Sequence, residues 1–318
     1  MTTATTLGKV AKLAHAIEDN VATVIRGKPD AVRLAMVGLL AEGHLLIEDV
    51  PGVGKTLLAK SLARSIDCSV QRVQFTPDLL PSDVTGVTVY SPDTGEFEFK
   101  PGPIFANVVI GDEINRAGPK TQSAMLEAME ERTVTIDGTT HELGSPFLVM
   151  ATQNPIELEG TYPLPEAQRD RFLLRLALGY PDLDAELDIL RTHGRGSTLD
   201  QLRPVADASQ VSQMIRAVRD AHVSEAVEHY LVAVCRATRE HGEVELGASP
   251  RGTLGLLRAT RANAVLEGRD FVVPDDIKAI APHLLPHRLI MRPEAQLAGR
   301  TPEEAVADVL AGVPAPTE

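Results

Sequence analysis

The chain has 318 residues, of which 43% are hydrophobic and 24% charged, as expected for a globular protein of two domains. Asp and Glu number 44 against 31 Lys and Arg, giving a net charge of −13. Because an acidic surface repels phosphate backbones, broad nucleic-acid binding is disfavoured. The only two cysteines, Cys68 and Cys235, lie far apart, so we expect neither a disulfide framework nor a cysteine metal site.

Targeting segments are not evident. The first 14 residues lack an apolar stretch followed by small residues, so no secretory signal is predicted. Arg33, Glu42 and Asp49 interrupt the most apolar region, so no membrane span is predicted. We therefore expect a cytoplasmic protein.

The first third of the chain contains a strand, a glycine loop and a helix in succession. Apolar residues at helical spacing predict helices over residues 7–25 and 29–41. A short apolar strand, 44–47, then leads into a loop, 48–56, and a helix that reaches residue 66. This order is the context that a phosphate-binding loop requires.

The loop has the residues that phosphate binding needs. Gly52 and Gly54 let the backbone approach phosphate oxygens, because no Cβ is in the way. Lys55 can reach the β- and γ-phosphates, and the Thr56 hydroxyl can bind Mg²⁺. The usual pattern opens with glycine, and here that place is Asp49. A chance glycine turn before a helix is the alternative for the loop alone.

Two carboxylates follow the next buried strand. After a strand at 70–75 and a hairpin at 87–99, an apolar strand at 108–111 ends in Asp112 and Glu113. Ligands of parallel sheets bind beyond the carboxyl ends of the strands, so Asp112 could hold Mg²⁺ through water. Glu113 could polarise the water that attacks the γ-phosphate. The alternative is an ordinary solvated strand end.

A third strand end adds an amide. A helix at 119–131 and a hairpin at 133–143, which contains no Lys or Arg, precede a strand at 146–152. Asn154 follows this strand and could hydrogen-bond the γ-phosphate or the attacking water. An Asn before proline is otherwise a common turn former.

Beyond residue 181 the pattern changes from strands to helices. Helical periodicity covers 183–192, 208–220, 225–241, 250–267 and 274 to about 289, with linkers at 194–200 and 242–248. We therefore divide the chain into domains 1–181 and 182–318. Ser249 and Pro250 open one of these helices, and Arg251 follows. An arginine is poorly placed for the helix dipole there, which slightly favours a functional role.

In combination these motifs resemble those of an AAA+ ATPase, and their sequences are most similar to those of the MoxR family. The resemblance rests on residues 48–56, 112–117, 122–131 and 151–155, and it extends from about residue 24 to 289. It implies an α/β P-loop NTPase core, with a parallel sheet between helices and inserted β-hairpins, followed by a small helical lid. It also implies binding of ATP and Mg²⁺.

The resemblance gives roles to individual residues. Lys55 and Thr56 would form the Walker A pair, Asp112 and Glu113 the Walker B pair, and Asn154 would be sensor 1. Thr56 and Asp112 would hold the metal. The nucleotide-binding residues would be Arg26, Gly27, Pro51, Gly52, Val53, Gly54, Lys55, Thr56, Leu57 and Asp112, although Lys28 replaces the more usual Gln beside the adenine.

Two arginines receive catalytic roles from the same resemblance. Arg171 matches the finger that reaches a neighbouring subunit's ATP, because guanidinium can neutralise charge developing on the γ-phosphoryl group. Arg169 is a rival for this role. The alternative for Arg171 is an ion pair with Asp170 or Glu166 on a solvated helix. Arg251 matches sensor 2, which would contact the γ-phosphate of its own subunit.

For the whole protein, the resemblance implies a homo-oligomeric, hexameric ring that remodels or activates partner proteins. Such clients include proteins with von Willebrand A domains and metalloenzymes that receive cofactors. The alternative is an AAA+ nucleic-acid motor or helicase loader, which the excess of acidic residues disfavours. A nucleotide-gated switch without turnover is a third interpretation, and it requires that Glu113 not act as a base.

Overall fold

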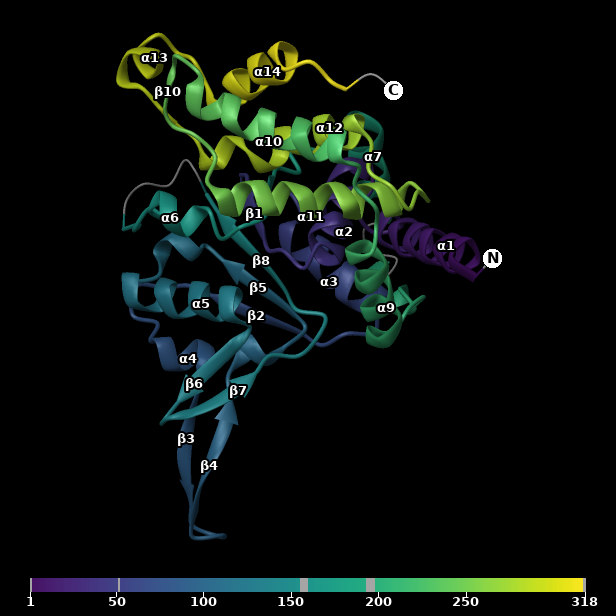
Figure 1. The fold of residues 1–318 in the computed structure, drawn as a ribbon. Coiled ribbons are helices and arrows are strands. Elements are labelled where there is room, and N and C mark those ends of the chain that lie inside the picture. Colours follow the sequence, from purple (N-terminus) through teal and green to yellow (C-terminus); the bar gives the residue numbers. More distant parts are fainter. Residues whose placement is uncertain (1, 51, 155–159, 193–197, 317–318) are drawn as a thin grey trace.

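A parallel five-stranded sheet lies at the centre of the larger part of the molecule (Figure 1). The computed structural model describes residues 2–50, 52–154, 160–192 and 198–316. The strand order is β2-β5-β8-β1-β9, with all neighbours parallel. The strands are β1 (Leu45–Glu48), β2 (Val70–Gln74), β5 (Val108–Asp112), β8 (Leu148–Gln153) and β9 (Leu174–Leu176).

Both faces of this sheet are covered. Leu45 and Ile47 of β1 belong to one hydrophobic cluster and Leu46 to another, because successive side chains of a strand point to opposite faces. The first cluster includes α1 (Thr2–Ala22), α2 (Pro29–Leu40) and α3 (Lys55–Ser65). The second includes α4 (Pro81–Thr85), α5 (Pro119–Glu131), η1 (Pro103–Phe105) and η2 (Ile114–Arg116). The predicted α/β architecture is thereby confirmed.

Two β-hairpins extend from this core, at the bottom of Figure 1. One consists of β3 (Gly86–Ser91) and β4 (Glu96–Pro101), and the other of β6 (Thr133–Ile136) and β7 (Thr139–Glu142). The second turns at Asp137 and Gly138, which both have positive φ, as the sequence pattern indicated. Both predicted hairpins are present.

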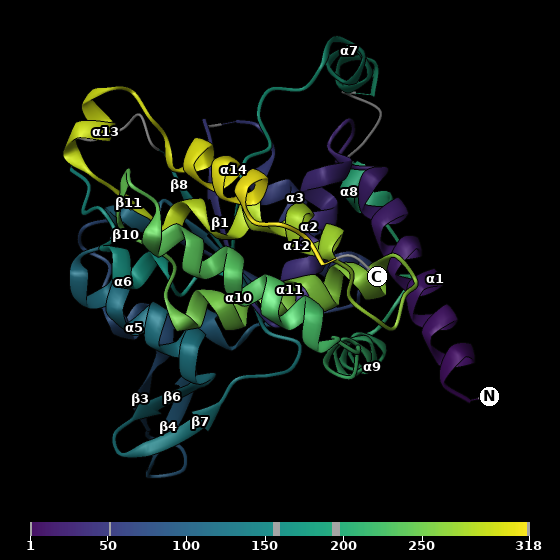
Figure 2. The ribbon, with the colours of Figure 1, turned by 45° about the horizontal axis from the view of Figure 1, so that its top comes forward.

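The C-terminal part is helical, and Figure 2 shows it across one side of the core. Its helices are α7 (Leu183–Thr192), α8 (Thr198–Gln201), α9 (Ala208–Arg219), α10 (Glu225–Glu240), α11 (Pro250–Leu266), α12 (Pro274–Leu284), η3 (Pro286–Arg288), α13 (Pro293–Leu297) and α14 (Pro302–Gly312). Helix α11 also contacts α1 and α2, so one hydrophobic cluster is continuous across the predicted domain boundary. Along the described ranges, no helix combines the length and apolarity that crossing a bilayer needs.

The structure differs from the sequence-based elements in several places: α4, α13 and α14 were not predicted, and α8 overlaps the predicted linker at 194–200. Strand β9 was not predicted, because three residues are too few to show a period. The segment predicted as a linker at 242–248 contains β10 (Val244–Leu246), which pairs with β11 (Ile290–Met291). The last long helix ends at Leu284, not near 289, and Pro286 begins a 3₁₀ turn there because proline cannot donate a backbone hydrogen bond.

Arg288 joins the lid to the core. Its side chain is only 3% exposed, and its Nε lies 2.8 Å from Asp170 Oδ1. Its terminal nitrogens donate to the carbonyl oxygens of Phe172, at 2.5 Å, and Leu173, at 3.1 Å. Burial lowers the pKa of Arg288 to about 10, which leaves the guanidinium charged at neutral pH. The segment that leads into β9 is therefore fixed by a cation from the lid.

His44 fixes the start of β1 in a comparable way. The ring is buried, Nδ1 accepts from the backbone N–H of Val149 at 3.0 Å, and Nε2 lies 2.9 Å from Met129 O. These partners require a neutral ring with its proton on Nε2. Burial lowers the pKa of His44 to about 4. The end of α5 is thus tied to two adjacent strands.

We expect His44 to make stability depend on pH. The folded pKa lies below the unfolded value near 6.5, so the stabilisation is complete above that value and is lost as pH falls toward 4. Between pH 7.5 and pH 5, wild type should lose about 2 kcal/mol more unfolding free energy than His44→Gln. Urea unfolding at both pH values measures this difference. His229→Gln, on the exposed side of α10, should behave as wild type; an equal loss in His44→Gln would contradict the assignment.

Candidate functional site

The predicted phosphate loop lies at the carboxyl end of β1. Gly54, which directly precedes α3, has φ +98°, and Gly52 has φ +85°. A Cβ built on either glycine would meet no atom within 4 Å, so the space beside the loop is open. Val53 and Leu57 pack against the core and anchor the loop on both sides of Lys55. Pro51 lies outside the described residues.

Asp49, which replaces the usual opening glycine, has a structural role that the sequence did not reveal. Its carboxylate is 8% exposed and accepts three backbone hydrogen bonds. The donors are Val50 N at 2.8 Å, Leu178 N at 2.6 Å and Gly179 N at 2.7 Å. The loop is therefore tied to the chain as it leaves β9 toward the lid. The departure from the glycine pattern was the only sequence signal for this contact.

Lys55 lies inside the loop. Its Nζ donates to Asp49 O at 2.8 Å. Burial lowers the pKa of Lys55, and the charges of Asp49, Asp112 and Glu113 oppose that shift. Thr56, the next residue, places its Oγ1 3.4 Å from Asp112 Oδ2, so the acid at the end of β5 lies beside this end of the loop.

Asp112 stands at the end of β5, between hydroxyl groups. Its Oδ2 lies 3.4 Å from Thr56 Oγ1, and its Oδ1 accepts from Thr152 Oγ1 at 3.3 Å. Arg72, on the neighbouring strand β2, donates from Nε to Oδ2 at 2.6 Å. Carboxylate and hydroxyl oxygens are ligands suited to Mg²⁺, so Thr56 and Asp112 fit this ion. The contact with Arg72 was not predicted, because it joins residues 40 positions apart.

Glu113 is held in a left-handed backbone conformation with φ +60°. Its Oε2 accepts from Gln74 Nε2 at 3.1 Å and lies 3.3 Å from Arg116 Nε. Asn154 follows β8, whose last residue, Gln153, is in register with Glu48 of β1. Asn154 therefore shares the carboxyl edge of the sheet with the loop, as predicted.

The two predicted catalytic arginines line a polar cavity of about 230 Å³. Five arginines and three carboxylates line it: Arg132, Arg171, Arg251, Arg258, Arg288, Glu42, Glu130 and Asp170. Five positive against three negative charges leave the cavity positive. Burial lowers the pKa of Arg258, and Arg132 adds to this by repulsion. Such a surface favours an anion.

This cavity lies at the amino edge of the sheet. Gly43 and His44, which precede β1, form part of its wall, whereas the phosphate loop follows β1. The four residues of that strand separate the two places by roughly 13 Å. Arg251 belongs to the cavity: its NH2 pairs with Glu130, and its NH1 lies 3.7 Å from Asp170 Oδ2. Arg251, expected to contact the γ-phosphate of its own subunit, thus lies at the opposite edge of the sheet from the phosphate loop of that subunit.

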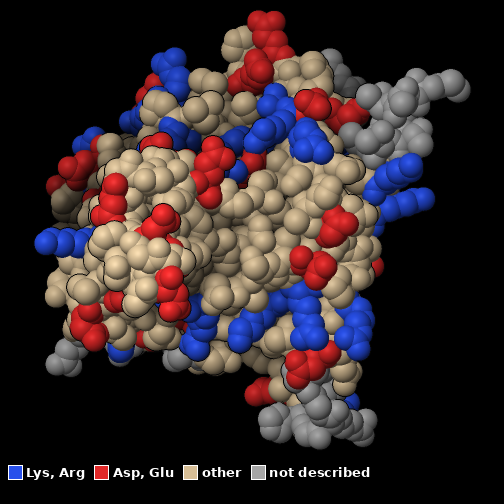
Figure 3. Space-filling model, turned by 90° about the horizontal axis from the view of Figure 1, so that it is seen from below, with Lys and Arg blue, Asp and Glu red and all other residues tan. Residues whose placement is uncertain are grey.

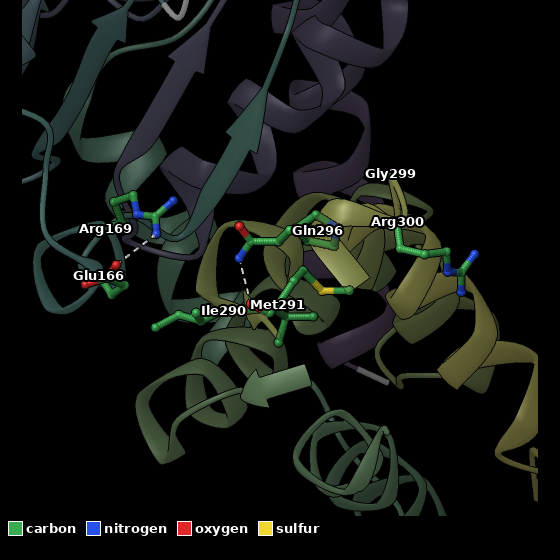
Figure 4. A pocket seen from close by; sticks show the side chains of 9 residues that line it. Glu166, Arg169, Ile290, Met291, Gln296, Gly299 and Arg300 are labelled. Atoms are coloured by element: carbon green, nitrogen blue, oxygen red, sulfur yellow. Dashed lines mark hydrogen bonds and ion pairs between the residues drawn. The ribbon is translucent and has the colours of Figure 1, made fainter. Parts of the chain in front are cut away.

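Arg169 and Arg171 face different surroundings. Arg169 lies 3.8 Å from Glu166 in α6 (Glu166–Arg169), on the wall of a separate pocket of about 390 Å³ (Figure 4). Figure 4 also shows Gln296 and Arg300 of the lid in that pocket. Arg171 pairs through Nε with Glu130 Oε2 at 3.1 Å, and not with Asp170 or Glu166. The geometry groups Arg171, and not Arg169, with Arg251.

The predicted adenine-side segment lies against the first lid helix. Arg26 NH1 is 2.7 Å from Asp188 Oδ2 in α7, and Lys28 Nζ donates to Tyr180 O at 2.6 Å. Gly27 has φ +69°, and a Cβ there would come within 3.1 Å of Ala185 Cβ. The Arg26 side chain is engaged in an ion pair. The backbone of this segment is therefore the part that an adenine ring could contact.

The sequence and fold of this chain are similar to those of known proteins. Residues 44–174 match the family model "ATPase family associated with various cellular activities (AAA)", and residues 236–309 match an AAA lid domain. The chain is 49% identical to YeaC of Bacillus subtilis over 96% of this chain and 95% of that protein. It is 42% identical to Chaperone MoxR1 of Mycobacterium tuberculosis, over 92% of this chain and 80% of that one. A crystal structure from Cytophaga hutchinsonii, named as a candidate ATPase, has a TM-score of 0.92 and 38% identity, covering 98% and 97% of the two chains.

Asp49 gives a prediction for this site. Asp49→Ala removes the acceptor of three backbone donors, so it should lower the free energy of unfolding by about 3 kcal/mol and weaken binding of a fluorescent ATP analogue. Asp49→Asn keeps one accepting oxygen and should have an intermediate effect. Asp93→Ala, in the exposed turn between β3 and β4, serves as control. Unchanged urea unfolding and analogue binding in Asp49→Ala would disprove the role.

Proposed function

Because the chain belongs to the MoxR family of AAA+ ATPases, we propose that two neighbouring subunits together complete each ATP site. The observation that carries this proposal is the separation of two half-sites within one subunit. The phosphate loop lies at the carboxyl edge of the sheet, and the positive cavity with Arg171 and Arg251 lies at the amino edge. In this proposal each ATP contacts residues of two subunits.

We assign the first half-site to residues near the phosphate loop. Lys55 binds the β- and γ-phosphates together with the backbone of Gly52 and Gly54. Thr56 and Asp112 hold Mg²⁺, which when bound neutralises phosphate charge. Glu113 takes a proton from the attacking water, and Asn154 orients that water. The remaining predicted contacts are the backbone at Arg26 and Gly27 and the loop residues Pro51, Val53 and Leu57.

The second half-site comes from the neighbour. Arg171 and Arg251 stabilise negative charge that develops on the γ-phosphoryl group, since guanidinium stays charged and donates in a planar fork. The excess of arginine over carboxylate in the cavity supports this role, because it favours an approaching anion. Arg251 therefore acts on the neighbour's nucleotide and not on that of its own subunit.

The family favours a hexameric ring that remodels protein clients. One relative is itself named a chaperone. We propose clients with von Willebrand A domains or metalloenzymes that receive cofactors. The hairpin of β3 and β4 fits a protein client, because Tyr90 and Phe97 stack edge to face at 5.5 Å and are 53% and 73% exposed. Such aromatic side chains bury apolar area on contact with a polypeptide.

Charge disfavours the nucleic-acid motor. The β3–β4 hairpin has Asp93, Glu96 and Glu98 against Lys100, and the β6–β7 hairpin has no Lys or Arg. In the view from below, Lys and Arg side chains gather in separate groups with acidic side chains between them (Figure 3). A phosphate backbone would meet repulsion at both hairpins.

If the ATP site is shared between two subunits (a trans site), replacing Arg171 should affect activity more than replacing Arg169. Arg171→Ala should lower kcat about a thousandfold with little change in ATP binding, because only transition-state charge loses its partner. Arg169→Ala, which alters the other pocket, should keep most of the activity. Steady-state kinetics with analogue binding measure both effects.

Dilution provides an independent check of shared sites. ATPase activity per subunit should fall as wild type is diluted until light scattering shows monomers. Constant activity per subunit in the monomeric state would contradict the proposal.

Glu113→Gln should bind ATP but hydrolyse it about a hundredfold more slowly, because the base is lost. Loaded with ATP and Mg²⁺ in its native extract, this variant should retain a client that Lys55→Ala does not retain. Mass spectrometry of the retained material tests the function. A von Willebrand A-domain protein or a metalloenzyme would agree with it, whereas retained nucleic acid would favour the motor.

A further inference from the structure

Glu130 contacts both catalytic arginines at once. It lies at the end of α5, with Oε2 3.1 Å from Arg171 Nε and Oε1 paired with Arg251 NH2. Arg171 belongs to the core and Arg251 to the first turn of lid helix α11. A single carboxylate thus links one cation from each part of the molecule.

The backbone on all three sides is fixed. The end of α5 is held by His44, whose Nε2 lies 2.9 Å from Met129 O. The segment before Arg171 is held by the ion pair of Asp170 with Arg288. At the start of α11, Ser249 accepts from Gly252 N at 3.1 Å and donates to Asp170 at 2.8 Å. What remains variable is the direction of the two long arginine side chains.

Glu130 restricts this freedom, and the arginine side chains stay partly exposed. Its Oε2 lies 3.1 Å from Arg171 Nε, and its Oε1 pairs with Arg251 NH2. Arg171, Arg251 and Glu130 are 29%, 43% and 32% exposed, so a neighbouring molecule can reach them. Two guanidinium groups at this spacing would repel each other without the carboxylate between them.

We propose that Glu130 is a positioning residue that presents Arg171 and Arg251 together to the neighbour's γ-phosphate. This rests on the proposed trans site. A guanidinium has five N–H donors, so Arg171, held at Nε, and Arg251, held at NH2, keep further donors that match phosphate oxygens. The catalytic gain comes from holding two cations in place before the nucleotide arrives. Glu130 itself does not touch the nucleotide.

The first test separates turnover from binding. Glu130→Ala should lower kcat about tenfold to a hundredfold while KM and analogue affinity stay within about twofold, because the nucleotide's own half-site is intact. Glu130→Gln keeps one accepting oxygen and should be intermediate. Glu127→Gln, exposed one turn earlier on α5, is the matched control and should match wild type. A wild-type kcat in Glu130→Ala would overturn the proposal. A rise in KM as large as the fall in kcat would also overturn it.

The second test asks on which side of the shared site Glu130 acts. Lys55→Ala subunits lack a working phosphate loop but keep their arginines. Co-expressed with Glu130→Ala subunits and purified through two different tags, they should restore ATPase activity at the interfaces between the two kinds. Co-expression of Lys55→Ala with Arg171→Ala is the reference for such rescue. Thermal melting and analogue binding first establish that each variant folds.

The outcomes are distinguishable. Rescue in both pairs supports the positioning role. Rescue with Arg171→Ala but not with Glu130→Ala overturns the role of Glu130 and keeps the trans site. Absence of rescue in both pairs, with folded and associated subunits, rejects the trans site and this inference with it.

Discussion

The buried ion pair of Asp170 with Arg288 fixes how the lid meets the core. A guanidinium 3% exposed is stable only when its donors are satisfied, and Arg288 also donates to the carbonyl oxygens of Phe172 and Leu173. The segment of the core next to Arg171 is therefore shaped by a residue of the lid. The same carboxylate reaches Ser249 at the start of α11. The positions of Arg171 and Arg251, the two proposed catalytic arginines, depend on this contact, although neither side chain is buried in it.

The sheet then gives the molecule two functional edges. Parallel strands end on the same side, so the loop, Asp112, Glu113 and Asn154 gather there. The connections back to the strands run to the opposite edge, where α5 ends and β9 begins. Arg171 precedes β9, so it lies at that second edge. Fold topology thus separates the groups that we propose bind phosphate from the arginines that we propose neutralise its developing charge.

The sequence predicted what depends on local pattern. The strand, loop and helix around Lys55, the acids after β5 and both hairpins could be located because each has a short, ordered signature. The contacts that organise these parts could not be predicted, because they join distant positions. Asp49 meets Gly179 across 130 residues, and Arg251 meets Glu130 across 121. The periodicity of apolar residues along the chain gives no information about contacts between such distant residues.

The position of Arg251 is the clearest example of a feature that the sequence could not predict. Its motif at the start of α11 was visible, but its partner depends on how the lid docks, which α1, α2 and η3 decide together. The family resemblance suggested a role for Arg251, whereas its position became known only from the packing of the lid on the core.

Two unlike edges also set the geometry of any assembly. If each amino edge must meet the carboxyl edge of the next subunit, the contact is heterologous and the assembly has a direction. Heterologous contacts close into a ring only when the rotation from one subunit to the next divides a full turn evenly; otherwise they continue into a helical filament. The angle between lid and core, which Arg288 helps to fix, then contributes to whether the assembly closes.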